Sequence, residues 1–127
     1  MKKVQIILKK RNLKTKKIYE EIVEFDENIK ELNLSDMNLV EIPKGLEQFK
    51  DVITLNLSNN QISKIENLDK NINLNALSLS NNKITKIENI HHLDKLEDFY
   101  LFNSNQSENI EETKQISLNI NHLNLIL

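Results

Sequence analysis

Cysteine and tryptophan are absent from the 127 residues, and glycine and proline occur once each. Without cysteine the fold contains no disulfide, no thiolate-bound zinc and no cysteine nucleophile. The single glycine, Gly45, excludes a glycine-rich loop that would cradle phosphates. The lack of cysteine favours a reducing compartment, so we expect a cytoplasmic protein, with the nucleus as the alternative.

Long apolar runs are missing near the start of the chain as well. Val4 and residues 6–8 form a short apolar stretch with lysines on both sides. Such a stretch is too short for the apolar part of a signal peptide or for a membrane span. We therefore expect a soluble protein with no membrane partner.

Acidic residues are absent from the first 17 positions, which hold eight lysines and arginines. The other 110 positions hold nine basic and nineteen acidic residues, so their net charge is 9 − 19 = −10. We interpret the basic segment as a solvated face, because no aromatic residues interleave its charges. The alternative is binding of nucleic acid or another acidic surface through these side chains: Lys2, Lys3, Lys9, Lys10, Arg11, Lys14, Lys16 and Lys17.

An internal repeat dominates what is present. Residues 52–62 and 74–84 match at a shift of 22 positions, and the similarity continues where 64–68 is answered by 86–90. Weaker copies extend the register on both sides. Chance does not easily produce agreement at two separate places in each copy, so the sequence predicts a solenoid.

The weaker copies set the expected boundaries of a single domain. At its start, Ile6, Leu8, Arg11 and Leu13 fit a degraded copy. The spacing of Ile18, Ile22 and Phe25 predicts a helix, because these residues fall on one helical face. The predicted parts of the domain 1–127 are a cap (1–28), four repeats (29–51, 52–73, 74–95 and 96–119) and a last strand (120–127) whose own cap is missing or incomplete.

The pattern L-x-x-L-x-L-x-x-N-x-I/L over residues 29–104 resembles the leucine-rich-repeat family. The 22-residue period and the Ile-Glu-Asn after each strand look like its short intracellular class. Phosphatase regulatory subunits, axonemal dynein light chains and acidic nuclear phosphoproteins belong to that class. The resemblance implies an α/β solenoid, a right-handed β-α superhelix with short parallel strands on the concave face and helical, 3-10 or irregular turns on the convex face. Met37 and Ser104 replace the asparagine of the repeat, so less regular outer turns are expected.

The asparagines of the repeat have a physical role that does not depend on the family. Asn60 and Asn82 lie where the chain leaves a strand, and a buried amide there satisfies backbone groups of neighbouring turns. Asparagine makes up 20 of the 127 residues. We interpret the remainder as a bias of composition, because asparagine favours turns over helix and strand interiors.

Function in a solenoid is expected on the exposed strand residues, which line one concave surface. In the fourth copy Tyr100 and Phe102 occupy positions where other copies carry Asn or Ser, and exposed aromatics anchor protein interfaces. The alternative is that residues 105–119 cover them. Glu31, Asp36 and Asp98 would form an acidic flank that steers a basic partner. The predicted partner-binding residues are Tyr100, Phe102, Asp98, Asn103, Asn56, Ser78, Glu31, His122 and Ile126.

Catalysis finds no candidate residues in this sequence. His91 and His92 follow the predicted convex segment and His122 lies on another strand, so no spacing brings them together as metal ligands. We interpret them as solvated surface histidines. The serines belong to the Leu-Ser-Asn pattern of the repeat and offer no triad. We expect a protein that is not an enzyme and has no cofactor or metal.

The last strand leaves an unshielded edge, which invites pairing. Residues 105–119 folding back, a partner or second copy, or a missing continuation of the chain would each cover it. The sequence therefore predicts a non-catalytic module that binds a protein partner of unknown identity on its concave face. Nucleic-acid or acidic-surface binding by the basic segment and self-assembly through the strand edge are the alternatives.

Overall fold

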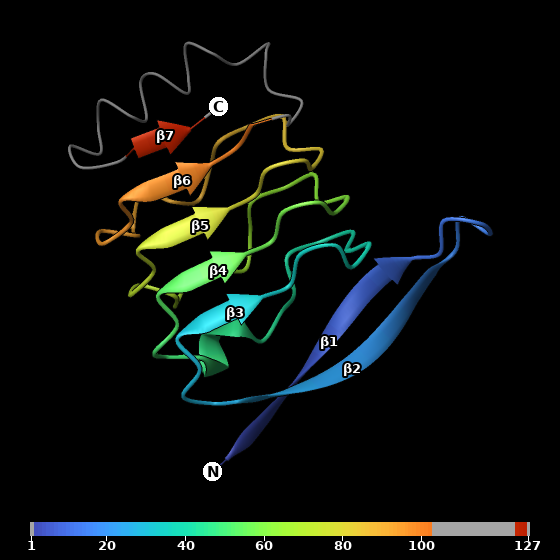
Figure 1. Ribbon diagram of the computed structural model, residues 1–127, viewed down its shortest axis with the longest axis horizontal. Helices are drawn as coiled ribbons and strands as arrows, with labels where there is room; N and C mark the ends of the chain where they lie inside the picture. Colours follow the sequence, from blue (N-terminus) through green and yellow to red (C-terminus); the bar gives the residue numbers. More distant parts are fainter. Residues whose placement is uncertain (1, 103–123, 127) are drawn as a thin grey trace.

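The computed structural model describes residues 2–102 and the backbone of residues 124–126. Five short strands are stacked in one parallel sheet in the order β3-β4-β5-β6-β7 (Figure 1). The strands are β3 (Glu31–Asn33), β4 (Thr54–Asn56), β5 (Ala76–Ser78), β6 (Asp98–Tyr100) and β7 (Asn124–Ile126). From β3 to β6 each strand pairs with the equivalent residues one repeat further on. The predicted stack of parallel strands is confirmed.

The second position of each strand faces the core. Leu32, Leu55, Leu77 and Phe99 are at most 2% exposed, while the residues on either side of them are exposed or half-buried. Period-two alternation produces this division into a core face and a solvent face. Other buried residues complete the row beside the strands and close the core from the far side: Leu34, Leu57, Leu79, Leu101, Ile62, Ile65, Leu68, Ile84, Ile87 and Ile90.

The convex side consists of turns, and the described residues contain one short 3-10 helix there, η1 (Leu46–Gln48). Single-turn hydrogen bonds join Asn71 N to Leu68 O at 3.2 Å and Leu93 N to Ile90 O at 3.0 Å. A 22-residue repeat leaves few residues between the strand and the next coil, so the chain turns without a full helix. The expected leucine-rich-repeat architecture with 3-10 and irregular turns is confirmed.

Buried asparagine amides join each coil to the one before it. Asn60 Oδ1 accepts hydrogen bonds from the backbone N–H groups of Met37 and Leu39, both at 3.0 Å. Its Nδ2 donates to Leu34 O at 3.0 Å, so one side chain of the second repeat satisfies three groups of the first. Asn82 makes equivalent bridges from the third repeat to the second. The predicted structural role of these two residues is confirmed.

Further asparagines outside that column also have structural roles. Asn67 and Asn89 adopt left-handed backbone conformations with φ of 63° and 59°. Each donates its Nδ2 to a carbonyl of the preceding coil, Ile42 O at 2.8 Å and Ile65 O at 2.7 Å. Asn71 is 4% exposed and donates to the first repeat in the same manner. Asparagine combines left-handed backbone with a short amide donor, so composition bias is the wrong explanation for these residues.

The N-terminal cap is a β-hairpin of β1 (Lys3–Arg11) and β2 (Ile18–Asp26), paired antiparallel over nine residues each. The prediction of a helix over residues 18–25 is therefore wrong. The prediction of a degraded repeat copy at residues 6–13 is also wrong, because β1 pairs with β2 and not with the parallel sheet. Branched and aromatic residues are dense in both segments and favour strands over a helix.

The hairpin shields the first coil with one face of β1. Val4, Ile6 and Leu8 alternate along that strand and are 5%, 2% and 1% exposed. From β2, Phe25 packs edge-on against Phe49 of the first repeat, with ring centroids 6.0 Å apart. A solenoid needs such a cap because its first coil would otherwise expose one side of the core.

The buried amide of Asn82 is expected to stabilise the stack. Replacing Asn82 by Ala leaves Ile62 N and the carbonyl of Leu57 without their side-chain partner in the core. Unsatisfied buried groups cost about 1–3 kcal/mol each, so the variant should lose about 2–4 kcal/mol in urea unfolding. Asn75→Ala is the control, because Asn75 is exposed and donates a long bond of 3.4 Å. Equal losses in the two variants would contradict the role of burial.

Gly45 provides a second test, because its φ of 93° lies in a region that side chains disfavour. A Cβ at this position would stand 3.0 Å from Gln48 Nε2, which can move, and 3.5 Å from Ile6 Cγ2. Gly45→Ala should therefore cost about 1–2 kcal/mol through the backbone, measured by thermal unfolding. Lys44→Ala, an exposed neighbour, should change stability by less than about 0.5 kcal/mol. A neutral Gly45→Ala variant would show that the turn relaxes.

Candidate protein-binding surface on the concave face

Two columns of side chains run across the solvent face of the sheet, because equivalent residues of parallel strands lie side by side. The first strand positions form one column and the third positions form the other. Members of both columns are exposed or half-buried. The first column is Glu31, Thr54, Ala76 and Asp98, and the second is Asn33, Asn56, Ser78 and Tyr100.

The asparagines of the second column shape the ends of their strands. Asn33 Oδ1 accepts hydrogen bonds from Ser35 N at 3.0 Å and Ser35 Oγ at 2.6 Å. Asn56 holds Ser58 with the same pair of distances. Asn56, a predicted binding residue, thus also closes a local turn. The Asn-x-Ser spacing carried this signal in the sequence, since Asn side chains commonly bond to the backbone two residues on.

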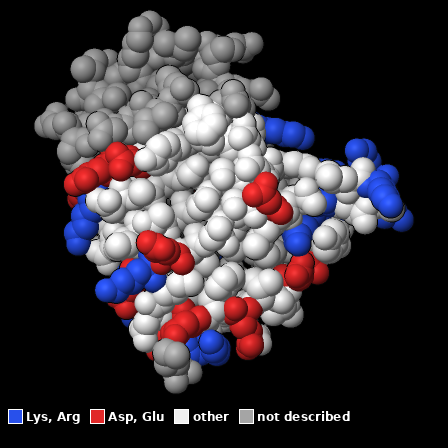
Figure 2. Space-filling model, viewed as in Figure 1, with Lys and Arg blue, Asp and Glu red and all other residues white. Residues whose placement is uncertain are grey.

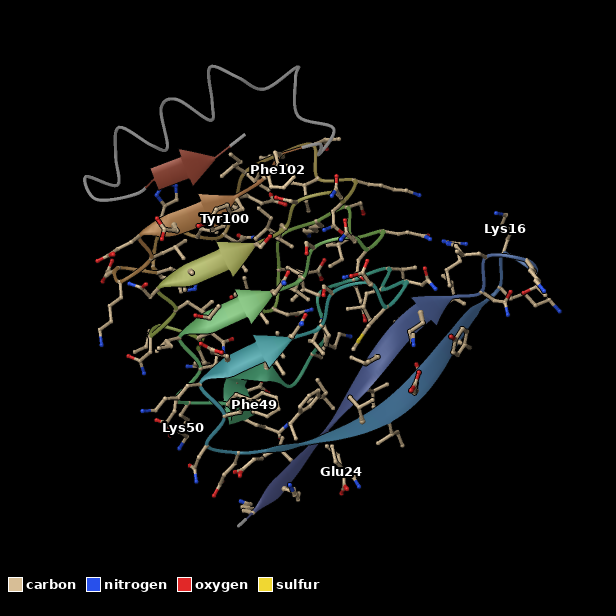
Figure 3. The ribbon with its side chains drawn as sticks, in the orientation of Figure 1. Lys16, Glu24, Phe49, Lys50, Tyr100 and Phe102 are labelled. Atoms are coloured by element: carbon tan, nitrogen blue, oxygen red, sulfur yellow. The ribbon has the colours of Figure 1, made fainter. Side chains whose placement is uncertain are left out.

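The fourth copy departs from this polar pattern. Tyr100 is half-buried and Phe102 is 42% exposed at positions where the second copy has Asn56 and Ser58. Figure 3 shows both aromatics on the β6 coil, at the end of the stack away from the hairpin. Beside them, Ser80 was expected on the exposed surface but is 1% exposed. The position is buried because it lies next to the bulky fourth copy, whose backbone Phe102 O accepts from Asn81 N at 3.0 Å.

The backbone register places Ile126 beside the aromatic end of the sheet. β7 pairs with β6 so that Ile126 lies opposite Tyr100 and Leu125 opposite Phe99. The spacing from the fourth copy is therefore 26 residues, and the predicted shift of 24 residues is wrong by two positions. Asn103 and His122 lie outside the described residues, as does the segment 105–119.

Charged side chains are distributed around the face and do not form one flank. Figure 2 shows a largely uncharged centre with acidic residues toward its margins. Glu31 and Asp98 share a column but are separated by three strand spacings, about 14 Å. Asp36 follows the opposite end of β3 from Glu31. The structure does not bring the three carboxylates of the predicted acidic flank together.

A groove of about 420 Å³ runs along the margin where the chain enters the strands. Ile53 is 41% exposed in its wall. The other lining residues are Lys30, Asp51, Asn73, Asn75 and Lys95. Mixed charge and amide groups beside an apolar side chain give this groove the character of an interface margin.

The histidines do not assemble a reactive centre within the described residues. His91 is exposed, whereas His92 is half-buried with Nε2 2.9 Å from Leu68 O. The interpretation of His92 as a solvated surface residue is therefore wrong, because it bridges two coils as the asparagines do. No group of three or more His, Asp or Glu side chains in the described part could hold a metal ion. In the same part, no helix has the length and apolarity to cross a membrane.

The basic residues of the N-terminal segment lie at separate places on the hairpin. Lys2 and Lys3 are at its open end, and the remainder gather toward its turn. Lys10 Nζ donates to Glu21 Oε2 at 2.8 Å, and this hydrogen bond raises the pKa of Lys10 above its ordinary value. The eight basic side chains thus do not form one continuous patch.

Comparison with known proteins identifies the architecture and leaves the family open. No family model matches the chain, and no curated protein matches it. Among solved structures, it is similar to internalin C2 from Listeria monocytogenes, with a TM-score of 0.61 and 22% identity. The match covers 78% of this chain and 41% of that protein, so the chain spans less than half of its length. At this identity the likeness concerns the fold alone, which is that of a leucine-rich-repeat solenoid.

Proposed function

We propose that the chain is a non-catalytic module that binds a protein partner on its concave face, with Tyr100 and Phe102 as the anchors. The observation that carries this proposal is the change of chemistry at the fourth copy. Small polar residues occupy the same positions in the first three copies, and two aromatics occupy them in the fourth. Neither aromatic faces the core, where Phe99 and Leu101 already lie.

The composition of the face supports protein binding around a local anchor. Aromatic residues dominate the energy of protein interfaces, while small neutral groups around them supply shape and exclude water. Ala76 and Ser78 on the neighbouring strand are small, so the rings of the fourth copy stand above the surface beside them. Leucine-rich-repeat solenoids present such concave surfaces in general, and this generality is an analogy of fold.

The cellular setting belongs to the same proposal. We place the chain in the short intracellular class of leucine-rich repeats and in the cytoplasm. The 22-residue period and the absence of cysteine from 127 residues support this placement. The partner is then a cytoplasmic protein, and we propose no cofactor.

Loss of both aromatics should abolish partner capture. Immobilised Tyr100→Ser/Phe102→Ser protein should retain at least tenfold less of the partner than the unmodified chain, since anchor truncation costs about 2 kcal/mol or more. Quantitative mass spectrometry of proteins retained from a cytoplasmic extract measures this loss. Thermal unfolding should change little, because Phe102 is 42% exposed and Tyr100 is half-buried.

Ile72→Ser is the matched control, because Ile72 is 54% exposed and lies outside the strands of the sheet. It should retain the same proteins as the unmodified chain. Identical retention by the double aromatic variant would remove the anchor proposal. Equal loss in both variants would show general stickiness of exposed apolar residues. Retention of a second copy of the chain would identify self-assembly as the interaction.

A further inference from the structure

The turn of the N-terminal hairpin is a second surface with its own chemistry. β1 and β2 extend away from the stack of coils, and Lys16 lies at the far end of this arm (Figures 1 and 3). Asn12 Oδ1 accepts from the N–H groups of Lys14 at 2.9 Å and Thr15 at 3.0 Å. Arg11 Nη1 donates to Lys16 O at 2.8 Å. These bonds give the tip a defined shape.

The tip carries positive charge without any acidic residue. Between positions 11 and 19 the basic side chains are Arg11, Lys14, Lys16 and Lys17, and no Asp or Glu is present. The first acid on the returning strand is Glu20, three residues beyond the backbone bond from Asn12 N to Lys17 O. At about 3.4 Å per strand residue, the last 10 Å or so of the arm is purely cationic.

Apolar side chains are exposed within the same 10 Å. Leu13 in the turn is 54% exposed, and Ile18 and Tyr19 at the start of β2 are 51% and 43% exposed. Ile22, further up the arm, is 64% exposed and lies opposite Ile7 on the neighbouring strand. These side chains contribute little to the core, so burial within this chain does not explain an aliphatic residue in a lysine-rich turn.

We propose that the hairpin tip docks end-on onto the surface of an anionic lipid bilayer. Peripheral segments bury apolar side chains about 5–10 Å into the boundary between headgroups and acyl chains, which matches the acid-free length of the tip. Leu13 and Ile18 enter that boundary, the lysines contact anionic headgroups, and Tyr19 has the amphipathic ring that interfaces favour. A nucleic acid would engage the lysines but would gain nothing from exposed aliphatic side chains.

The charge of the rest of the chain orients this contact. Residues 20–102 hold eight basic and sixteen acidic side chains, a net charge of 8 − 16 = −8. An anionic surface therefore repels the solenoid and attracts only the tip. The proposal revises the expectation of no membrane partner, which was based on the absence of a span. Peripheral docking requires no span.

Tryptophan fluorescence tests insertion directly, because the chain contains no tryptophan. The Leu13→Trp variant of the full chain is mixed with phosphatidylcholine vesicles containing about one-third phosphatidylserine. The emission should shift to the blue at low salt, and the shift should vanish with pure phosphatidylcholine or at about 0.5 M salt. Unshifted emission with the anionic vesicles would overturn the proposal.

Co-sedimentation with the same vesicles separates the contributions of charge and apolar contact. Lys14→Gln/Lys16→Gln/Lys17→Gln should bind about 100-fold more weakly, roughly fivefold for each charge. Leu13→Ser should bind about tenfold more weakly. The control with equal loss of charge replaces three exposed lysines of the solenoid and should bind as the unmodified chain does: Lys64→Gln, Lys70→Gln and Lys83→Gln.

A second probe, a single-stranded RNA without sequence preference, distinguishes lipid from polyanion recognition. Unchanged vesicle binding by Leu13→Ser, together with RNA binding that depends on the three tip lysines, would replace the membrane with a nucleic acid. Equal loss in the control triple variant would reduce the effect to net charge. Both outcomes overturn docking by the tip on lipid, and thermal unfolding of every variant verifies the fold.

Discussion

Every coil of a solenoid buries backbone N–H and C=O groups that its short strands cannot satisfy, and amide side chains from the next coil satisfy them here. Asn60 bonds to three backbone groups of the first repeat, and Asn82 bonds to equivalent groups of the second. Both side chains reach backward along the chain. Each repeat therefore depends on its successor, and leucine burial alone does not position neighbouring coils. The rest of the fold uses the spacing that these amides set.

The backward direction of these bridges explains the two ends of the column. Met37 can replace asparagine in the first copy because no earlier coil needs its amide. The hairpin meets that coil with backbone groups: Arg11 N donates to Asn38 O at 2.8 Å, and Val40 N donates to Lys9 O at 3.0 Å. A strand serves this purpose better than a helix, because the strand offers unpaired backbone groups along its edge. The cap is thus joined to the stack by the same kind of bond that joins the coils.

The sequence was sufficient where a signal repeats and insufficient where two structures share one pattern. Leucine spacing located the strands, and the buried role of Asn60 and Asn82 followed from their place at the strand ends. Ile18 and Ile22, four residues apart, share a face in a helix and in a strand, so spacing alone could not identify the hairpin. A shift of two residues likewise keeps every side chain of β7 on the same face, which left its register undetermined. Burial of Ser80 depends on the size of residues one coil away.

The two proposed surfaces lie at opposite ends of the molecule and need not compete. Tyr100 belongs to the fourth coil, three strand spacings or about 14 Å from β3, and the arm leaves the stack beyond β3 at the other end (Figure 1). A tip held on a bilayer would keep the acidic solenoid off the anionic surface, leaving the concave face open to a protein. The uneven charge of the chain then has one physical explanation, because the cationic end attaches and the acidic body stays in water.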